Sequence, residues 1–277
     1  MRTIPFVKMH GCGNDFVVID GRRETCALPP ELIARMADRH RGIGFDQLVL
    51  LEPAEDAAAR LRFFNADGGE SGACGNGTRC AARLLADRGE GRELLLRTAA
   101  GAIPCRVGGE GSVTVRLPPP RFDWREIPLA EAHDTLALPL ELPGLPPPVA
   151  VNMGNPHAVF FVEDLEALHV EALGRRIERH PLFPERVNVG FAELRGGGEI
   201  RLRVFERGSG LTLACGSGAC AALVAAVRRG LVEQGARLIL DGGVLEISWS
   251  GEGPVEMTGP AAYCFRGTFE PTDLLSD

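Results

Sequence analysis

Two short stretches of the sequence have nearly the same composition and decide how the chain is organised. Ala73-Cys74-Gly75-Asn76-Gly77 and Ala214-Cys215-Gly216-Ser217-Gly218 each place a cysteine before small residues and a run of helix-forming residues. The two cysteines lie 141 positions apart, which is about half of the 277-residue chain. This spacing indicates a duplicated unit with one cysteine at the start of a helix in each half.

The same spacing relates residues outside the two motifs. Asn14 corresponds to Asn155 and Gln47 to Asn188, again 141 positions apart. Over the seventeen residues that begin at the alanine of each motif, seven are identical without a gap. Chance matches among glycines and alanines would not keep one register over separated blocks, so an internal repeat is predicted.

The helices that follow the two cysteines are apolar around most of their circumference, so other elements must wrap each of them. We expect an α/β (α+β) fold of two pseudo-symmetric lobes, each a curled, mostly antiparallel sheet around a central helix, with the active site in the cleft between them. The run Pro118-Pro119-Pro120 marks the boundary. Residues 1–117 then form the N-terminal lobe and 118–262 the C-terminal lobe, with 263–277 packing back on the first. Helices are predicted at 31–40, 75–87, 170–180 and 216–229.

Composition excludes several classes of function. The net charge of −7 disfavours nucleic acid and anionic membranes as partners, and no apolar run reaches the ~18 residues that a membrane span needs. The eight cysteines form no C-x-x-C pair and no signal peptide precedes them, so a reduced cytoplasmic protein without a zinc site is expected. Lys8 is the only lysine, so a pyridoxal-phosphate enzyme would have to use this residue.

A cysteine at a helix start has chemistry that a buried cysteine lacks. The first N–H groups of a helix are unpaired, and the peptide dipoles add about half a positive charge there. We therefore expect lowered pKa values for Cys74 and Cys215, and a carboxylate bound by the backbone at Gly75-Asn76 and Gly216-Ser217. A thiolate on one face of a carbon and a thiol on the other would invert a stereocentre, with no cofactor.

Three further side chains are candidates for this site. His157 follows Asn155-Pro156 in a glycine turn and could tune the protonation of a thiol, although a structural histidine remains an alternative. Glu206 and Arg207 directly precede the second motif. They could bind an ammonium and a carboxylate, or they could simply be a solvated pair.

Seven motifs of this chain, in order, resemble those of the diaminopimelate epimerase family. They are KMHGCGNDF at 8–16, GIGFDQ at 42–47, FNADGGE at 64–70, ACGNGTRC at 73–80, MGNPH at 153–157, RVNVGF at 186–191, and ERGSG with ACGSGACA at 206–221. The resemblance covers essentially the whole chain. It implies a cofactor-independent isomerase that interconverts LL- and meso-2,6-diaminopimelate in lysine and peptidoglycan precursor biosynthesis.

The resemblance also implies roles for individual residues. Cys215 would abstract the α-proton in the LL-to-meso direction and Cys74 would donate one, with His157 and Glu206 adjusting the thiols. The family is commonly a homodimer supported by a C-terminal tyrosine, where this chain has Phe265. The implied substrate-binding residues are Asn14, Gln47, Asn65, Gly75, Asn76, Asn155, Asn188, Glu206, Arg207, Gly216 and Ser217.

Two alternatives remain open from the sequence. One is another cofactor-independent racemase of the same scaffold, acting on proline, hydroxyproline or histidine. Asn76 after the first Cys-Gly, where proline-type relatives have a histidine, argues against it. The other is a non-catalytic amino-acid-binding protein, which would not explain a cysteine at both helix starts.

Overall fold

The computed structural model describes residues 3–24, 26–72 and 74–275. Ala73 of the first cysteine motif and residues 276–277 of the predicted C-terminal segment lie outside this part. Among the described residues, no helix has the length and apolar character that crossing a membrane would require.

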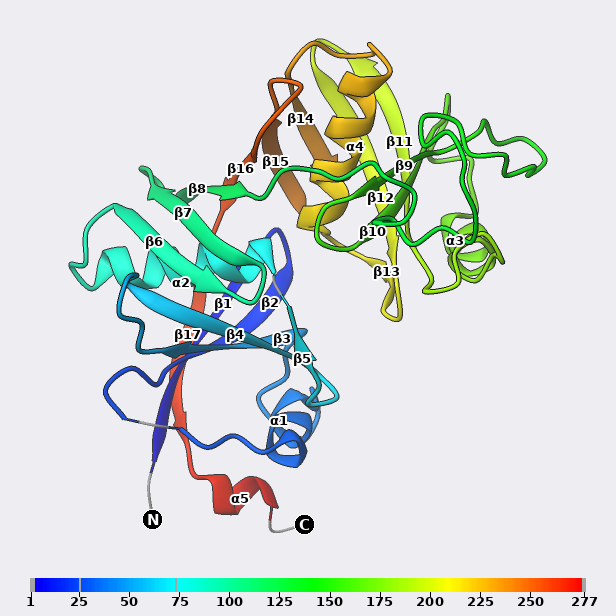
Figure 1. Ribbon diagram of the computed structural model, residues 1–277. Coiled ribbons are helices and arrows are strands. Elements are labelled where there is room, and N and C mark those ends of the chain that lie inside the picture. Colours follow the sequence, from blue (N-terminus) through cyan, green and yellow to red (C-terminus); the bar gives the residue numbers. More distant parts are fainter. Residues whose placement is uncertain (1–2, 25, 73, 276–277) are drawn as a thin grey trace. The chain divides into compact units, whose positions relative to one another are not determined.

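The chain divides into two compact units (Figure 1). Unit 1 consists of Met1–Val115 together with Gly259–Asp277, and unit 2 of Arg116–Thr258. Each unit has its own set of strands, its own apolar core and its own cysteine motif.

The sheet of unit 1 is mostly antiparallel. Its strands are β1 (Ile4–Gly11), β2 (Asn14–Asp20), β3 (Gln47–Glu52), β4 (Ala59–Asn65), β5 (Glu70–Ser71), β6 (Glu93–Thr98), β7 (Gly101–Val107), β8 (Ser112–Leu117) and β17 (Ala262–Phe269). They pair in the order β17-β1-β2-β3-β4-β6-β7-β8, with β5 on β4, and only β2/β3 and β4/β6 are parallel among these pairs. The helices are α1 (Pro30–Ala37), α2 (Gly75–Asp87) and α5 (Pro271–Leu275).

Unit 2 repeats this arrangement. Its elements are β9 (Val149–Asn152), β10 (Pro156–Phe161), α3 (Val170–Glu178), β11 (Asn188–Gly196), β12 (Glu199–Glu206), β13 (Gly210–Thr212), α4 (Gly216–Arg228), β14 (Gly235–Leu240), β15 (Gly243–Ser248) and β16 (Val255–Pro260). The order β9-β10-β11-β12-β14-β15-β16, with β13 on β12, and the parallel pairs β10/β11 and β12/β14 match those of unit 1.

The predicted internal repeat is confirmed at the level of strand register. Phe16 pairs with Gln47 between β2 and β3, and His157 pairs with Asn188 between β10 and β11, each 141 positions later. Helices α2 and α4 are related by the same offset at both ends. The predicted fold class, a mixed fold of two repeated, mostly antiparallel lobes, is therefore correct.

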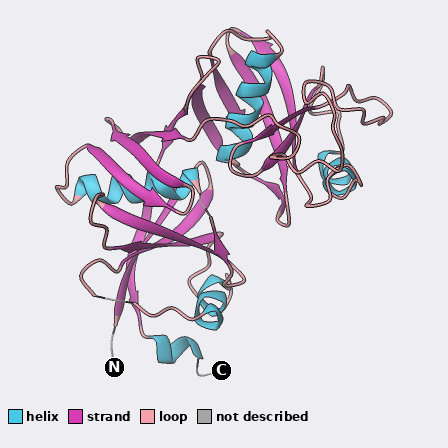
Figure 2. Ribbon diagram, in the orientation of Figure 1, coloured by secondary structure: helices cyan, strands magenta, loops and turns pink. Residues whose placement is uncertain are grey.

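Each unit wraps its strands around one helix, as the apolar helix sequences predict (Figure 2). Helix α2 contacts β1, β2, β3, β6 and β7, and α4 contacts β9 to β12, β14 and β15. Glycines allow the close approach at the two helix starts. A Cβ on Gly77 would lie 2.9 Å from Phe63 Cε1, and one on Gly218 would lie 2.9 Å from Val204 Cγ2. Both positions therefore exclude a side chain.

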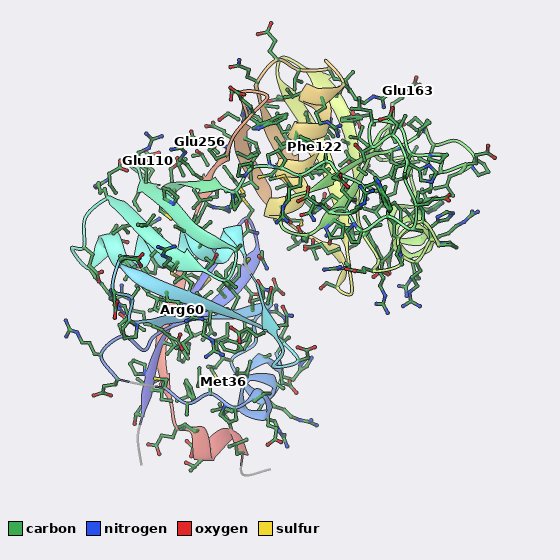
Figure 3. The ribbon with its side chains drawn as sticks, viewed as in Figure 1. Met36, Arg60, Glu110, Phe122, Glu163 and Glu256 are labelled. Atoms are coloured by element: carbon green, nitrogen blue, oxygen red, sulfur yellow. The ribbon has the colours of Figure 1, made fainter. Side chains whose placement is uncertain are left out.

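A second helix covers the other side of each sheet. Helix α1 buries the apolar stripe of Leu32, Ile33 and Met36, the last labelled in Figure 3. The predicted helix 31–40 is too long at its end. The carbonyl of Met36 accepts from the N–H groups of Ile43 and Gly44, because the chain turns back there to enter β3.

The strands that were not predicted include β1 and β17, which pair with each other at one edge of unit 1. Residues 8–11, from the start of the KMHGCGNDF motif, belong to β1, which pairs with β2 along one edge and with β17 along the other. The polar residues Lys8 and His10 conceal the strand pattern. Lys8 is nevertheless 6% exposed, because its amine is paired inside unit 1.

Candidate active site

Cys74 and Cys215 occupy equivalent positions at the start of α2 and α4. Each is the N-cap residue with extended backbone. The Cys74 sulfur accepts from the N–H of Gly77 at 3.5 Å, and the Cys215 sulfur accepts from the N–H of Gly218 at 3.3 Å. Each sulfur therefore lies at the positive end of a helix dipole, as the sequence predicts.

Unit 1 brings four of the predicted site residues into two pairs of amides. Asn76 Nδ2 donates to Asn14 Oδ1 at 3.0 Å, joining the first turn of α2 to the start of β2. Gln47 Nε2 donates to Asn65 Oδ1 at 2.9 Å, because these residues face each other across β3 and β4. The side chains around Cys74 that the sequence predicts for the site are thus uncharged.

A charged network that the sequence analysis missed lies next to Asn14. Asp46 Oδ2 accepts from Asn14 Nδ2 at 2.8 Å, and Arg39 donates to both Asp46 and Asp15. Lys8 pairs with Asp15 and also donates to the carbonyl of Gly44. Asp46 directly precedes Gln47 in the GIGFDQ motif, and this adjacency is the sequence signal that could have found it.

The network changes the protonation of Asp15. Burial by itself raises the pKa of this carboxyl, but hydrogen bonds from Arg39 and Lys8 outweigh burial and lower the pKa to about 2. Asp15 is therefore a carboxylate throughout the physiological range. Since Asn14 donates to the anionic group at Asp46, its Oδ1 faces Asn76 as an acceptor.

The Cys215 sulfur has a different environment from that expected. Its pKa is raised well above the ordinary value, first by burial and then by the Glu206 carboxylate, although Ser217 and the N–H of Gly218 act in the opposite direction. The predicted lowering of the pKa is wrong for Cys215. The helix dipole is outweighed because the side chain is only 5% exposed and lies beside a carboxylate.

His157 reaches Cys215 through a serine hydroxyl. Its Nε2 lies 2.9 Å from Asn155 Oδ1 and 3.1 Å from Ser217 Oγ, and Ser217 Oγ lies 3.6 Å from the Cys215 sulfur. The amide oxygen can only accept, so Nε2 carries the proton. Burial, and secondarily Arg207, lowers the pKa of His157 to about 3, so the ring is neutral near pH 7.

The remaining predicted residues of unit 2 surround the turn before Cys215. Asn188 donates to the carbonyl of Pro156 at 2.8 Å and accepts from the N–H of Arg207 at 2.9 Å. The Arg207 guanidinium is exposed and donates to the carbonyl of Glu185 at 3.0 Å. This arrangement fixes the backbone of the turn while the charged group of Arg207 faces solvent.

Comparison with known proteins identifies the family. The family model described as diaminopimelate epimerase matches residues 6–122 and 149–264. A diaminopimelate epimerase from Acidiphilium cryptum (strain JF-5) is 53% identical over 270 residues, with 98% of each chain covered. The one from Rhodospirillum centenum (strain ATCC 51521 / SW) is 54% identical over 272 residues, covering 97% of this chain and 93% of its own. The chain belongs to the diaminopimelate epimerase family.

Solved structures extend the likeness of fold beyond this family. A hydroxyproline epimerase from Agrobacterium vitis, with bound trans-4-hydroxy-L-proline, superposes with a TM-score of 0.69 at 19% identity, covering 96% of this chain and 92% of its own. A Bacillus anthracis protein of the PhzF family gives 0.71 at 18% identity, covering 98% and 100%. At this identity, the likeness concerns the fold alone.

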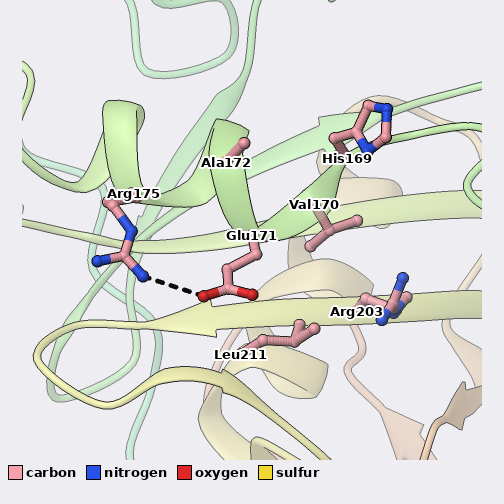
Figure 4. A pocket seen from close by; sticks show the side chains of 7 residues that line it. All are labelled: His169, Val170, Glu171, Ala172, Arg175, Arg203 and Leu211. Carbon is pink, nitrogen blue, oxygen red and sulfur yellow. Dashed lines mark hydrogen bonds and ion pairs between the residues drawn. The ribbon is translucent and has the colours of Figure 1, made fainter.

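A pocket on unit 2 lies apart from the residues predicted for the diaminopimelate epimerase site. It is an open depression of about 520 Å³ beside α3, in which Arg175 pairs with Glu171 (Figure 4). It is lined by His169, Val170, Glu171, Ala172, Arg175, Arg203 and Leu211. Within the described part of the chain, no group of three or more His, Cys, Asp or Glu side chains could hold a metal ion.

Proposed function

We propose that this chain is a cofactor-independent epimerase that interconverts LL- and meso-2,6-diaminopimelate, with Cys74 and Cys215 as the acid/base pair. Membership of the diaminopimelate epimerase family supports the substrate and the place in lysine biosynthesis. The observation that carries the two-base mechanism is the duplicated helix start, where each sulfur accepts a helix N–H.

The two helix starts also supply backbone N–H groups for the reacting carboxylate. The reacting carboxylate gains negative charge when the α-proton leaves, and backbone N–H groups at Gly75-Asn76 and Gly216-Ser217 are proposed to bind it. Helix N-termini favour such an anion, and they bind it more strongly as its charge increases. This difference between ground state and transition state is what accelerates the reaction.

The environment of Cys215 determines its protonation state before reaction in each direction. With its raised pKa, Cys215 rests as the thiol, the form that donates a proton in the meso-to-LL direction. In the LL-to-meso direction Cys215 must first lose its proton, and the adjacent Glu206 carboxylate is the group positioned to accept it. The neutral ring of His157 acts as a hydrogen-bond donor to Ser217, whose hydroxyl then faces the sulfur.

The two ends of the substrate need different groups. The non-reacting end carries a second carboxylate and a second ammonium, for which Arg207 and Glu206 are the complementary charges. Amide groups from both units complete the proposed binding set. They are Asn14, Gln47, Asn65, Asn76, Asn155 and Asn188.

We also propose a cytoplasmic homodimer. All eight cysteines lie in the described part of the chain and none of them is in a disulfide there, which suits a reducing compartment. Phe265 on β17 is 50% exposed, an unusual position for a large aromatic ring, and Phe6 contacts it edge-on at 5.9 Å. Sedimentation velocity tests the dimer, and Phe265→Asp should shift the protein towards the monomer.

Solvent deuterium tests the proposed function. Dialysed enzyme and LL-diaminopimelate in D₂O, without added cofactor, should give meso product with deuterium at the epimerised α-carbon. Proline and trans-4-hydroxyproline under the same conditions are the control for a related racemase and should show no exchange. Full turnover with the original protium retained would contradict the two-base mechanism.

A further inference from the structure

The hairpin before Cys215 presents one face with three side chains. Strands β12 and β13 pair so that Val204 lies opposite Thr212 and Glu206 opposite Gly210. Because side chains alternate between the faces of a strand, Val204, Glu206 and Thr212 share a face. Gly210, which has a φ of +83°, has no side chain opposite Glu206. The side chain of Thr212 can therefore reach the Glu206 carboxylate.

This face packs on the start of helix α4. A Cβ placed on Gly218 would lie 2.9 Å from Val204 Cγ2 and 3.2 Å from the Cys215 sulfur. The sulfur therefore lies beside the strand that carries Glu206, and the Glu206 carboxylate helps to raise the pKa of the Cys215 thiol.

Thr212 holds this carboxylate from the other side. Thr212 Oγ1 donates to Glu206 Oε1 at 2.5 Å. Glu206 is half-buried, so without a fixed partner its flexible side chain could turn the carboxylate towards water. A short bond to one carboxylate oxygen restricts that rotation.

We propose that Thr212 is a positioning residue whose hydroxyl holds the Glu206 carboxylate on the hairpin face that packs on the start of helix α4, beside Cys215. Its consequence for catalysis rests on the proposed function, whereas its effect on the thiol does not. Unit 1 supplies the contrast. Ser71 and Asn65 stand at the positions equivalent to Thr212 and Glu206, and Asn65 is an uncharged amide bonded to Gln47.

The protonation of Cys215 can be measured without any turnover. The full-length protein is alkylated with iodoacetamide over a range of pH, and the peptide that contains Cys215 is quantified by mass spectrometry. Thr212→Val removes the hydroxyl with little change of shape, and Thr212→Ser keeps it. Loss of the carboxylate contact should lower the pH midpoint of alkylation by about one unit in Thr212→Val, while Thr212→Ser should match the wild type.

A double-mutant comparison separates positioning from other effects. Glu206→Gln alone should lower the midpoint, and adding Thr212→Val to it should change nothing further. An unchanged or higher pH midpoint in Thr212→Val would overturn the proposal. The proposal would also fail if adding Thr212→Val to Glu206→Gln lowered the midpoint as much as Thr212→Val does in the wild type. If Thr212→Val does not fold, Thr212→Ala provides the same measurement. Absence of deuterium from the α-carbon in the D₂O experiment would contradict the proposed function. The alkylation midpoints would still test the effect of Thr212 on Cys215.

Discussion

The two helix starts differ in charge although their backbones are equivalent. At α2 the neighbouring predicted residues are uncharged, and the charged groups Arg39, Asp15 and Asp46 lie behind Asn14. At α4 the Glu206 carboxylate raises the pKa of the Cys215 thiol, and the imidazole of His157 reaches the sulfur through the Ser217 hydroxyl.

The differences lie at equivalent positions of the repeat. Asn65 in unit 1 corresponds to Glu206 in unit 2, and Phe16 corresponds to His157. Duplication explains why both sulfurs cap a helix, but a two-base reaction needs one thiol and one thiolate at a time. The substitutions between repeats therefore give the two sulfurs different neighbouring groups on a common scaffold.

Removal of either thiol should have the largest effect. Cys74→Ala and Cys215→Ala should each reduce kcat by about 10²–10⁴-fold, because general acid/base catalysis contributes about that much. Steady-state assays in both directions measure this effect. Because each cysteine acts as base in one direction and as acid in the other, each variant should lose activity in both directions.

Buried cysteines on the same helices are matched controls for these variants. Cys80 in α2 and Cys220 in α4 are both fully buried, so their replacement by alanine tests packing without removing a capping sulfur. Both controls should keep kcat within about threefold of the wild type, because a cysteine-to-alanine change in a core removes few contacts. Wild-type activity in Cys74→Ala or Cys215→Ala would contradict the proposed role of that cysteine as an acid/base catalyst.

Asp15 has no counterpart in unit 2, where Pro156 occupies the equivalent position. Asp15→Asn should lower the free energy of unfolding by about 2–4 kcal/mol, because it leaves the Lys8 amine buried without its carboxylate. Urea unfolding followed by circular dichroism measures the loss. Asp56→Asn is the control, since its ion pair with Arg97 is on the surface, where solvent screens it, and its loss should change stability far less.

The pH dependence of this contribution has a definite sign. The pKa of Asp15 is lowered from 3.8 to about 2 in the folded protein, so the unfolded chain binds its proton first as the pH falls. The stabilisation is complete above pH 3.8 and is lost as the pH falls towards 2. A wild-type stability that exceeds that of Asp15→Asn by the same amount at pH 2 and pH 6 would contradict this assignment.

His157 should give unit 2 a pH dependence that Phe16 cannot give unit 1. Its pKa is lowered from 6.5 to about 3, mainly by burial, so the unfolded chain binds an additional proton between these values. Stability should therefore fall with decreasing pH below 6.5, by about 1.4 kcal/mol per unit, and His157→Gln should remove this slope.

Tryptophan fluorescence isolates unit 2 in this measurement, because both tryptophans of the chain, Trp124 and Trp249, lie within it. Urea unfolding at pH 7.5, 6 and 5 gives the slope for the wild type and the variant. Parallel curves for the two proteins would show that the imidazole does not resist protonation in the folded state.

The repeat made the fold predictable, because one spacing aligns both cysteines, Asn14 with Asn155 and Gln47 with Asn188. Helices α2 and α4 were predicted within one residue, since small residues before an apolar run mark where each begins. Strand β1 was missed because Lys8 interrupts its apolar pattern, and the partner that buries Lys8 becomes visible only once β1 and β2 pair.

The position of Cys74 and Cys215 at helix starts was predictable, but the direction of the pKa shift of Cys215 was not. The dipole at a helix start follows from sequence, whereas the burial of Cys215 and its contact with Glu206 depend on how the hairpin of β12 and β13 folds over α4. Thr212 was overlooked for the same reason. Its equivalence to Ser71 in the repeat is visible, but its bond to Glu206 needs the strand register.

Replacement of Asp46 should have the smallest effect of these changes, and we expect it on KM. Asp46→Asn keeps the shape of the side chain but removes the charge that orients Asn14. If Asn14 holds the substrate equally in ground and transition states, KM should rise about two- to tenfold, corresponding to about 0.5–1.5 kcal/mol for one hydrogen bond, and kcat should change little. Asp123→Asn, which alters an exposed turn of unit 2 where Arg125 N–H donates to the carboxylate, is the control and should leave both constants unchanged. A fall in kcat at constant KM would instead mean that the amides of unit 1 stabilise the transition state. The groups around both helix starts would then contribute to catalysis, and the uncharged groups at α2 would not serve binding alone.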